Sequence, residues 1–408
     1  MKVLIICQYF YPDITAAAFR ITDVAELLTK WGNDVRVITA FAHKGEVSGD
    51  AAERLSLPEA HIYRNAMRPL GKGGFSTYIR HYLSFVQGSI ASAWRLRRTG
   101  WRPDIIWASA PPLFTSISGY AAAKMFRKPW VLDVRDIWPE SAVAAGQLRR
   151  GGLAFRVGKW MEAFSYLSAA HITCVSVPME RYITSRTRTQ VTIVYNGVKL
   201  ADIMDAAKPT FGGDRRRVLL YAGNLGRVQA LDVLVRAIAE LGRCGGMDGW
   251  EVRLVGNGAV RTELIALIKD LGLEGGVKVQ PPVARSQIAQ EVCQADALFL
   301  GLKSDPALRL TIPSKLFDCL AANKPVVAAI TGEGAEIAGR SGGNVVCAPG
   351  ETAALRKALE ILFANFDDLA ARALRNSNII RESFTREKAV SVLADVLHRV
   401  HREGLDGH

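Results

Sequence analysis

The feature that most constrains this chain is an alternation of short apolar runs with amphipathic segments, which occurs twice along its 408 residues. Residues 16–31, for example, have the apolar spacing of a helix and lie between two such runs. Runs that are apolar throughout are typical of strands buried on both faces of a parallel sheet. The first half therefore predicts a helix-covered parallel sheet with strands at residues 3–7, 34–39, 105–108, 130–134, 171–175 and 191–194.

The alternation fades over residues 199–217, which indicates a linker, and then begins again. In the second half we predict strands at residues 218–221, 250–255, 277–280, 297–302 and 326–330, and helices at residues 231–241, 261–271, 286–294 and 316–322. A chain of this length also favours two domains. We therefore predict an α/β protein of two Rossmann-like domains facing across a cleft. The first comprises residues 1–200, with a C-terminal helix at about 386–403 packing back on it, and the second comprises residues 213–385. Ligands are expected at the carboxyl ends of the strands.

The charge of the chain favours anionic partners. The net charge is +13 and the pI is about 9.6, which suits nucleic acid, a phospholipid surface or a phosphorylated small molecule. The six cysteines form no close pair, so we expect buried thiols in a reducing compartment. The first apolar run is short for a signal peptide, and the longest uncharged run, residues 105–123, contains two prolines. We therefore expect a cytoplasmic protein without a membrane span.

One loop in the second half has the residues of a phosphate site. Gly223 and Asn224 follow a predicted strand, and Arg227 precedes a predicted helix. Backbone amides and a guanidinium would converge there on a phosphate group. A plain loop with an exposed arginine is the alternative.

The next loop contains Gly256, Asn257 and Gly258 directly after a predicted strand. Its glycines allow another backbone to approach closely. A dinucleotide fingerprint would need a third glycine where Arg261 stands, and it normally opens a domain. A nicotinamide cofactor is therefore not expected.

A third segment starts a predicted helix with Pro313, Ser314 and Lys315. Free amides at a helix N-terminus and one mobile cation would bind a diphosphate. Asp318, one turn further on, could accept hydrogen bonds from the vicinal hydroxyls of a ribose. A capped surface helix with an exposed lysine is the alternative.

Two loops of the first half lie at strand ends on the expected ligand side. The loop after residue 7 is rich in small residues, among them Thr15 and Ala16, which leaves room for a ligand. The loop after residue 134 is dense in polar and aromatic side chains. These are Arg135, Asp136, Trp138 and Glu140.

Residues 64–102 contain many arginines and aromatic residues but no acidic residue. This mixture is typical of a helix at an anionic membrane interface. A nucleic-acid surface and a solvated basic face are the alternatives. The membrane hypothesis rests on Arg80, Trp94, Arg95, Arg97 and Arg98. His398 and His401 share a helix face, but nothing nearby completes a ligand set, so no metal site is predicted.

Eight segments carry a resemblance to a known family. In chain order they are "YFYPDITAAAFR", "LDVRDIWPES", "WMEAFSYLSAAHITCVS", "IVYNGV", "YAGNLGRVQALDVL", "LVGNG", "PSKLFDCLAANKPVV" and "GRSGGNVVCAPGE". Together they resemble the family 4 glycosyltransferases, which are retaining enzymes of the two-Rossmann GT-B fold, and most closely the branch that builds bacterial surface polysaccharides.

The resemblance implies roles for the residues described above. Arg227 and Lys315 would hold the diphosphate of a sugar nucleotide without a metal ion and stabilise the charge of the leaving group. Asp318 would bind the ribose hydroxyls, and residues 256–258 would border the base. Arg135 and Asp136 would face the reacting sugar and the acceptor.

The chain departs from the family pattern at several positions. Leu310 stands where most relatives have the first glutamate of a Glu-(seven residues)-Glu signature, and Glu333 is the expected replacement. Asp318 is one methylene shorter than the second glutamate. Gln229 and Asn224 replace a lysine and an arginine. In the first half, residues 15–17 replace paired glycines, and Arg135 occupies a position where a histidine is frequent.

The expected function is that of a metal-independent, retaining hexosyltransferase. It would transfer a sugar from a UDP-hexose or UDP-N-acetylhexosamine to a lipid-linked or oligosaccharide acceptor at the inner face of the cell membrane, without a cofactor or nucleic-acid partner. A sugar-nucleotide epimerase of the same fold is one alternative, although no acid and base pair for it is visible. A non-catalytic nucleotide-sugar-binding protein is the other, and Leu310 favours it.

Overall fold

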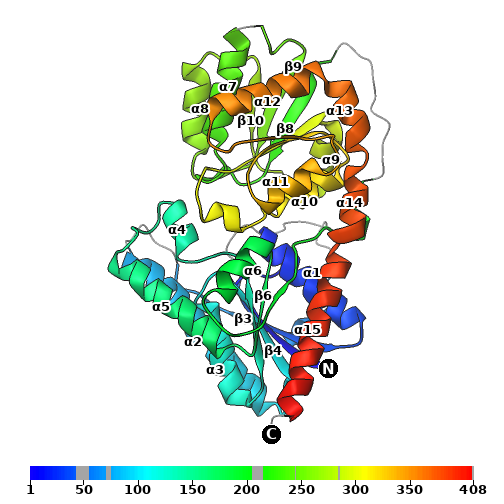
Figure 1. The fold of residues 1–408 in the computed structure, drawn as a ribbon. Coiled ribbons are helices and arrows are strands. Elements are labelled where there is room, and N and C mark those ends of the chain that lie inside the picture. The colour runs from blue at the N-terminus through cyan, green and yellow to red at the C-terminus, as the bar shows by residue number, and fades with distance from the viewer. Residues whose placement is uncertain (43–54, 70–74, 205–214, 244, 284, 407–408) are drawn as a thin grey trace. The chain divides into compact units, whose positions relative to one another are not determined.

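The computed structural model describes residues 1–42, 55–69, 75–204, 215–243, 245–283 and 285–406 (Figure 1). The chain forms two compact units. Unit 1 comprises Met1–Asn196 and Arg386–His408, and unit 2 comprises Gly197–Thr385. The predicted linker lies in part outside the described residues. Its first residues include a short 3-10 helix, η2 (Leu200–Asp202), and its last residue, Arg217, already belongs to a strand.

Unit 1 is built on a seven-stranded parallel sheet in the order β3-β2-β1-β4-β5-β6-β7. The strands are β1 (Lys2–Ile6), β2 (Asp34–Ala40), β3 (Ile62–Asn65), β4 (Ile105–Ala110), β5 (Trp130–Val134), β6 (His171–Cys174) and β7 (Val191–Ile193). The helices are α1 (Ala16–Lys30), α2 (Phe75–Arg98), α3 (Thr115–Phe126), α4 (Glu140–Ala144), α5 (Leu153–Ser168), α6 (Val177–Thr184) and α15 (Arg386–Asp406), with the short η1 (Glu59–His61) before β3.

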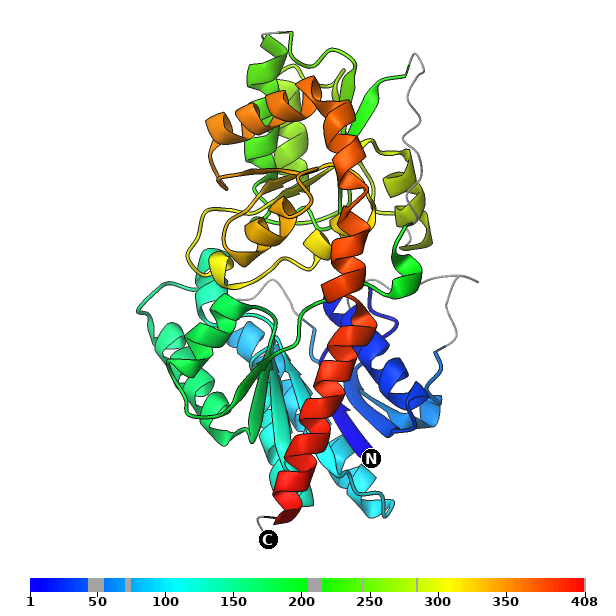
Figure 2. The ribbon, with the colours of Figure 1, turned by 45° about the vertical axis from the view of Figure 1, so that its right-hand side comes forward.

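The core of unit 1 explains why its C-terminal helix is part of it. The central strands are buried along almost their whole length, as expected for a sheet covered on both faces. Helix α15 packs along α1 (Figure 2), where Val390, Leu393 and Leu397 join the apolar cluster around Val24 and Leu28. The last helix of the chain therefore completes the core of unit 1.

Unit 2 is built on a six-stranded parallel sheet in the order β10-β9-β8-β11-β12-β13. The strands are β8 (Arg217–Ala222), β9 (Trp250–Val255), β10 (Val277–Gln280), β11 (Ala297–Gly301), β12 (Val326–Ala329) and β13 (Val345–Cys347). The helices are α7 (Leu231–Arg243), α8 (Arg261–Asp270), α9 (Arg285–Gln294), α10 (Lys315–Ala321), α11 (Glu333–Gly339), α12 (Thr352–Ala364), α13 (Phe366–Ala373) and α14 (Asn376–Ser383), with the short η3 (Leu308–Leu310) before α10.

Both sheets have a point where the strand order reverses, and this positions the candidate sites. In unit 1 the reversal lies between β1 and β4, and in unit 2 it lies between β8 and β11. Successive connections leave in opposite directions at such a point, so the loops at the carboxyl ends of the two strands leave a crevice. The loops after β1, β4, β8 and β11 are therefore the places to search for ligands.

The structure confirms the predicted α/β class, with a Rossmann-like parallel sheet in each unit. The predicted strands and helices are present, and their ends either coincide with the predicted ones or differ by one to three residues. The short strands β3 and β13 were not predicted, and neither were individual helices at the positions of α3, α4, α5, α6, α11, α12, α13 and α14. Among the described cysteines, Cys7, Cys174 and Cys319 are buried as expected, but Cys293 is exposed, so the prediction of buried thiols is wrong there.

Candidate functional site

In unit 2, two glycine-containing loops lock together backbone to backbone. The amide of Gly223, after β8, donates to Val255 at 2.8 Å, and the amide of Leu225 donates to Asn257 at 2.9 Å. A Cβ atom on Gly256 would overlap the carbonyl oxygen of Gly223, and one on Gly258 would overlap that of Leu225. Gly256 also has a φ of +147°, which favours glycine. The predicted close backbone approach is therefore made by the neighbouring loop of the same unit.

Lys315 lies directly over this pair of loops. Its Nζ occupies the space that a side chain on Gly223 would fill, and it lies 4.0 Å from the centroid of the Tyr221 ring. Burial lowers the pKa of Lys315 to about 8, although Cys319 and Asp318 act in the opposite direction. The half-buried ammonium therefore lies between a bare backbone and an aromatic ring rather than on an exposed surface helix.

The other predicted residues of unit 2 differ in their exposure and in their contacts. The first turn of α10 forms through Pro313 and Ser314, whose carbonyls accept from Leu316 and Phe317 at 2.9 and 3.1 Å. Asp318 is exposed on the same helix. Arg227 is exposed and forms an ion pair with Glu263 of α8 at 3.8 Å.

Asn224 and Asn257, which the sequence placed in these loops, make hydrogen bonds within unit 2 that fix the loops. The carbonyl of Asn224 accepts a hydrogen bond from the Tyr221 hydroxyl at 2.6 Å. The side-chain oxygen of Asn257 accepts from the amide of Gly258 at 2.9 Å. Both contacts fix the backbone that faces Lys315.

The start of α11 lies beside the loop that contains Leu310. A Cβ atom on Gly332 would lie 3.0 Å from the carbonyl oxygen of Arg309, and the φ of Gly332 is +74°. Glu333 follows immediately as the first residue of α11. The start of α11, where Glu333 stands, therefore lies beside the loop that contains Leu310.

In unit 1, a cavity of about 260 Å³ lies at the point of strand reversal. It is lined by residues that follow β1, β4 and β5, together with one residue of α2. These are Tyr9, Thr15, Ala17, Tyr82, Pro111, Pro112, Leu113, Phe114 and Trp138. Of the predicted acceptor-side residues, Thr15 and Trp138 line the cavity, whereas Ala16 and Glu140 do not.

Two features give this cavity its shape. The Thr15 hydroxyl accepts from the amide of Ala18 at 3.1 Å and caps α1, so this residue also starts the helix. The ring of Tyr82 stacks on Phe114, with centroids 5.5 Å apart. The walls are mainly apolar.

Arg135 and Asp136 follow β5, with a buried ion pair behind them. The Asp133 carboxylate accepts from Arg20 at 2.6 and 3.2 Å, and also from Ser109 and Thr173 at 2.8 Å each. Burial and the charge of Arg20 lower the pKa of Arg135, yet a guanidinium stays protonated at neutral pH.

The two residues at this strand end are both buried, and one of them has an unsatisfied donor. Within the described part of the chain, the Nε of Arg135 is buried and has no acceptor. Burial also raises the pKa of Asp136, although hydrogen bonds from Ser141 and Ile137 oppose the shift. Unsatisfied buried polar groups are rare in proteins and are found at functional sites.

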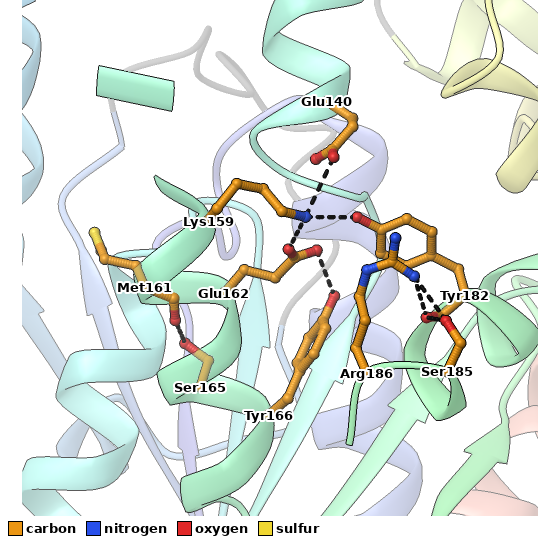
Figure 3. A network of polar contacts seen from close by, with 9 residues as sticks. All are labelled: Glu140, Lys159, Met161, Glu162, Ser165, Tyr166, Tyr182, Ser185 and Arg186. Atoms are coloured by element: carbon orange, nitrogen blue, oxygen red, sulfur yellow. Dashed lines mark hydrogen bonds and ion pairs between the residues drawn. The ribbon is translucent and has the colours of Figure 1, made fainter. Parts of the chain in front are cut away.

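Glu140 belongs to a polar network rather than to the cavity (Figure 3). Lys159 of α5 pairs with Glu140 at 3.2 Å and with Glu162, and it donates to the Tyr182 hydroxyl at 2.8 Å. The Tyr166 hydroxyl donates to the other oxygen of Glu162 at 3.2 Å. Burial raises the pKa of Glu162, and the contact with Lys159 counteracts this effect. The network ties α4, which follows Trp138, to α5 and α6.

The predicted membrane residues lie on or near the outer face of α2. Arg80, Trp94, Arg95, Arg97 and Arg98 are exposed, and Arg98 stacks on the Trp94 ring at 4.7 Å. The segment's other aromatic residues include Tyr82, Phe85 and Trp101, which are buried. In the described residues, no helix is both long and apolar enough to cross a bilayer, and no three metal-ligating side chains of the His, Cys, Asp and Glu types cluster.

Sequence reasoning missed Arg20, Asp133, Lys159, Glu162 and Tyr182. Two of these residues could have been identified from the sequence. Asp133 is a charged residue in the middle of an apolar strand, and Glu162 is the single acidic residue of α5. A charge at such a position is a candidate for a buried ion pair.

Comparison with solved structures defines the class. HepE from Anabaena, in the crystal structure of its complex with UDP-glucose, superposes with a TM-score of 0.71 and covers 98% of this chain and 100% of that one at 18% identity. With its two Rossmann-like units, the protein has the GT-B fold.

Sequence comparison narrows the class to a family. The model for the "Glycosyl transferase 4-like domain" matches residues 15–197, and that for "Glycosyl transferases group 1" matches residues 216–365. WbjE of Pseudomonas aeruginosa, which is named as a glycosyltransferase, is 25% identical over 57% of this chain, and the match covers 59% of its own length. WcaI of Escherichia coli, whose name refers to colanic acid biosynthesis, is 23% identical over 94% of this chain and 98% of its own length. The chain belongs to the family 4 glycosyltransferases.

Proposed function

We propose that this protein transfers a sugar, with retention and without a metal ion, from a nucleotide-sugar donor to a lipid-linked or saccharide acceptor in polysaccharide biosynthesis. The donor would be a UDP-hexose or a UDP-N-acetylhexosamine. The observation that carries the proposal is the half-buried ammonium of Lys315 over the bare backbone of Gly223.

A diphosphate suits this part of unit 2 for two reasons. Gly223 leaves the loop backbone accessible, and Lys315 supplies a positive charge directly over it. Arg227 would bind the outer phosphate, and Asp318 the ribose hydroxyls, from their exposed positions. The complexes of HepE with UDP and UDP-glucose support a nucleotide-sugar as the ligand.

The same lysine would provide the main catalytic contribution. When the glycosidic bond breaks, negative charge develops on the leaving diphosphate, and a fixed ammonium stabilises that charge without reorganising. Glu333 would hold the donor sugar, because its helix begins next to the loop of Leu310.

The acceptor would bind in unit 1, at the cavity beside Thr15 and Trp138. Arg135 and Asp136 follow the strand next to this cavity and would face the acceptor, and the buried Nε of Arg135 has no hydrogen-bond acceptor within the described residues. The exposed arginines of α2 would keep the protein at an anionic membrane surface, where a lipid-linked acceptor is found. The colanic acid assignment in the name of WcaI supports the polysaccharide role.

The first experiment is a thermal-shift panel with UDP, GDP, CDP, TDP and ADP, each with and without EDTA. A ligand that binds the native state raises the melting temperature, so one nucleotide should give a shift that EDTA leaves unchanged. The anomeric configuration of the product, followed by NMR with the matching nucleotide-sugar, then tests retention.

Three outcomes would contradict parts of the proposal. A shift that EDTA abolishes would contradict the metal-free site. Binding without any sugar transfer or donor hydrolysis would indicate a non-catalytic binding protein. Conversion of the nucleotide-sugar to its epimer would indicate the second alternative.

A further inference from the structure

Helix α5 displays an apolar stripe that the core does not use. Leu153, Val157, Trp160 and Leu167 have exposed fractions of 78%, 48%, 68% and 69%, and Phe164 lies between them in sequence. Their spacing of three or four residues puts all five on one side of the helix. At 1.5 Å per residue the stripe is about 21 Å long. We call these five residues the α5 stripe.

The aromatic members of the stripe form an ordered surface. Trp160 and Phe164 stack with ring centroids 5.9 Å apart, and Phe164 meets Tyr120 of α3 edge-on at 5.0 Å. Lys124 lies 5.5 Å from the centroid of Tyr120. The stripe therefore continues onto α3, where it ends at a cation.

The surroundings of the stripe are basic. Arg149 and Arg150 are exposed just before α5, and Arg156 is exposed beside Leu153 and Val157. Helix α3 packs between α2 and α5, and α2 displays Arg80, Arg95, Arg97 and Arg98. The sequences of α2, α3 and α5 contain one acidic residue, Glu162.

The Glu162 carboxylate is buried within the polar network, so it adds no negative charge to the surface of these helices. Glu162 is 2% exposed, and Lys159 and Tyr166 bind its two oxygens (Figure 3). The remaining charged side chains of these three helices are all cationic. By contrast, α1 and α15, which pack together, carry Glu26, Glu387, Asp395 and Glu403.

We propose that the α5 stripe inserts into the interfacial region of an anionic lipid membrane, with the arginines before α5 and on α2 binding the lipid headgroups. A helix that is apolar on one side and basic at its borders lies in the plane of such an interface. A second copy of this chain is a poorer occupant, because two such surfaces would bring like charges together. The inference deepens the membrane association in the proposed function, and it moves the apolar anchor from Trp94 of α2 to α5.

The first test measures binding to vesicles of phosphatidylcholine alone and of phosphatidylcholine with 30% phosphatidylglycerol, by flotation, without donor or acceptor. Wild type should float with the anionic vesicles only. The triple variant Leu153→Ser, Trp160→Ser, Leu167→Ser should lose at least about tenfold in partitioning. The matched control is Ile265→Ser with Ile361→Ser, which removes exposed apolar residues of α8 and α12 and should float like wild type.

A second measurement does not depend on how the triple variant folds. Brominated lipid acyl chains should quench part of the tryptophan fluorescence of the wild type, and Trp160→Phe should remove that part. UDP affinity, measured in parallel, should be the same in all variants. Unchanged UDP affinity with lost flotation would thus separate this inference from the donor site.

Two results would overturn the inference. These are normal flotation of the triple variant and equal loss in the control variant. If normal flotation is accompanied by a change from dimer to monomer in the triple variant, the stripe is an interface with a second copy of the chain.

Discussion

The loops at the strand reversals of the two units are built in opposite ways. In unit 2 the surface is made where side chains are missing, because Gly223, Gly256 and Gly258 let two loops and one lysine meet. In unit 1 the corresponding surface is made of rings and prolines, with the Arg20–Asp133 pair buried behind it. A bare backbone with a cation suits a charged diphosphate, whereas apolar walls suit a larger, less charged ligand. Four changes test this contrast.

The largest effect is expected for the ion pair behind the unit 1 site. Asp133→Ala leaves the Arg20 guanidinium buried without its carboxylate, which should lower the free energy of unfolding of unit 1 by about 4 kcal/mol. Urea unfolding followed by tryptophan fluorescence reports on unit 1, since Trp250 is the one tryptophan of unit 2.

The control for this change is an exposed pair. Asp367→Ala removes the partner of Arg217 in unit 2, where both side chains are in contact with water, and should cost about 0.5 kcal/mol by circular dichroism. Equal costs for the two changes would refute the distinction between the units.

The second effect concerns the bare backbone of unit 2. Gly256→Ala puts a Cβ atom onto the Gly223 carbonyl at a φ of +147°, and it should destabilise unit 2 by about 3 kcal/mol and abolish UDP binding. Gly242→Ala, in α7 with open space around it, should be neutral or slightly stabilising. Circular dichroism and calorimetric titration with UDP measure both, and normal UDP affinity in Gly256→Ala would count against the site.

The third effect isolates the cation. Lys315→Ala should weaken UDP binding about 30-fold, since a charge-assisted hydrogen bond contributes about 2 kcal/mol. Lys269→Ala removes an exposed lysine of the same unit and should leave the affinity unchanged. An equal affinity in the two variants would remove Lys315 from the diphosphate site.

The smallest effect is a pH dependence. The pKa of Lys315 is lowered to about 8, so the free protein loses this positive charge as the pH rises through 8. Because the diphosphate requires the protonated form, the Kd for UDP should increase up to about tenfold between pH 7 and pH 9. A phosphate with a second pKa near 6 keeps its charge over this range. Lys315→Ala should show no such increase, and a flat wild-type profile would contradict the assignment.

The local sequence pattern was sufficient to predict the parallel strands and several residues of the unit 2 site. Apolar runs predicted the parallel strands, since a strand buried on both faces must be apolar throughout. Gly223, Gly256 and Lys315 were predicted because each directly follows a strand or starts a helix, and such positions share one edge of a sheet. Strands β3 and β13 were missed because they are short and only partly buried.

The remaining features depend on contacts between distant segments. Lys159 and Glu140 are 19 residues apart, and Arg20 and Asp133 are 113 residues apart, so no local periodicity links them. Tyr82 enters the unit 1 cavity from α2, and its burial was hidden in a segment that looked uniformly basic and aromatic.

The sequence by itself determined the two α/β units, the family and the glycine loops, because these depend on residue types within a few positions of one another. The tertiary structure alone decided that Lys315 lies between Gly223 and the Tyr221 ring, that Tyr82 and Phe85 of α2 belong to the core, and that α5 keeps an apolar stripe outside. Which side of an amphipathic helix is buried depends on the layer it packs against, and that layer is assembled from strands far away in the chain.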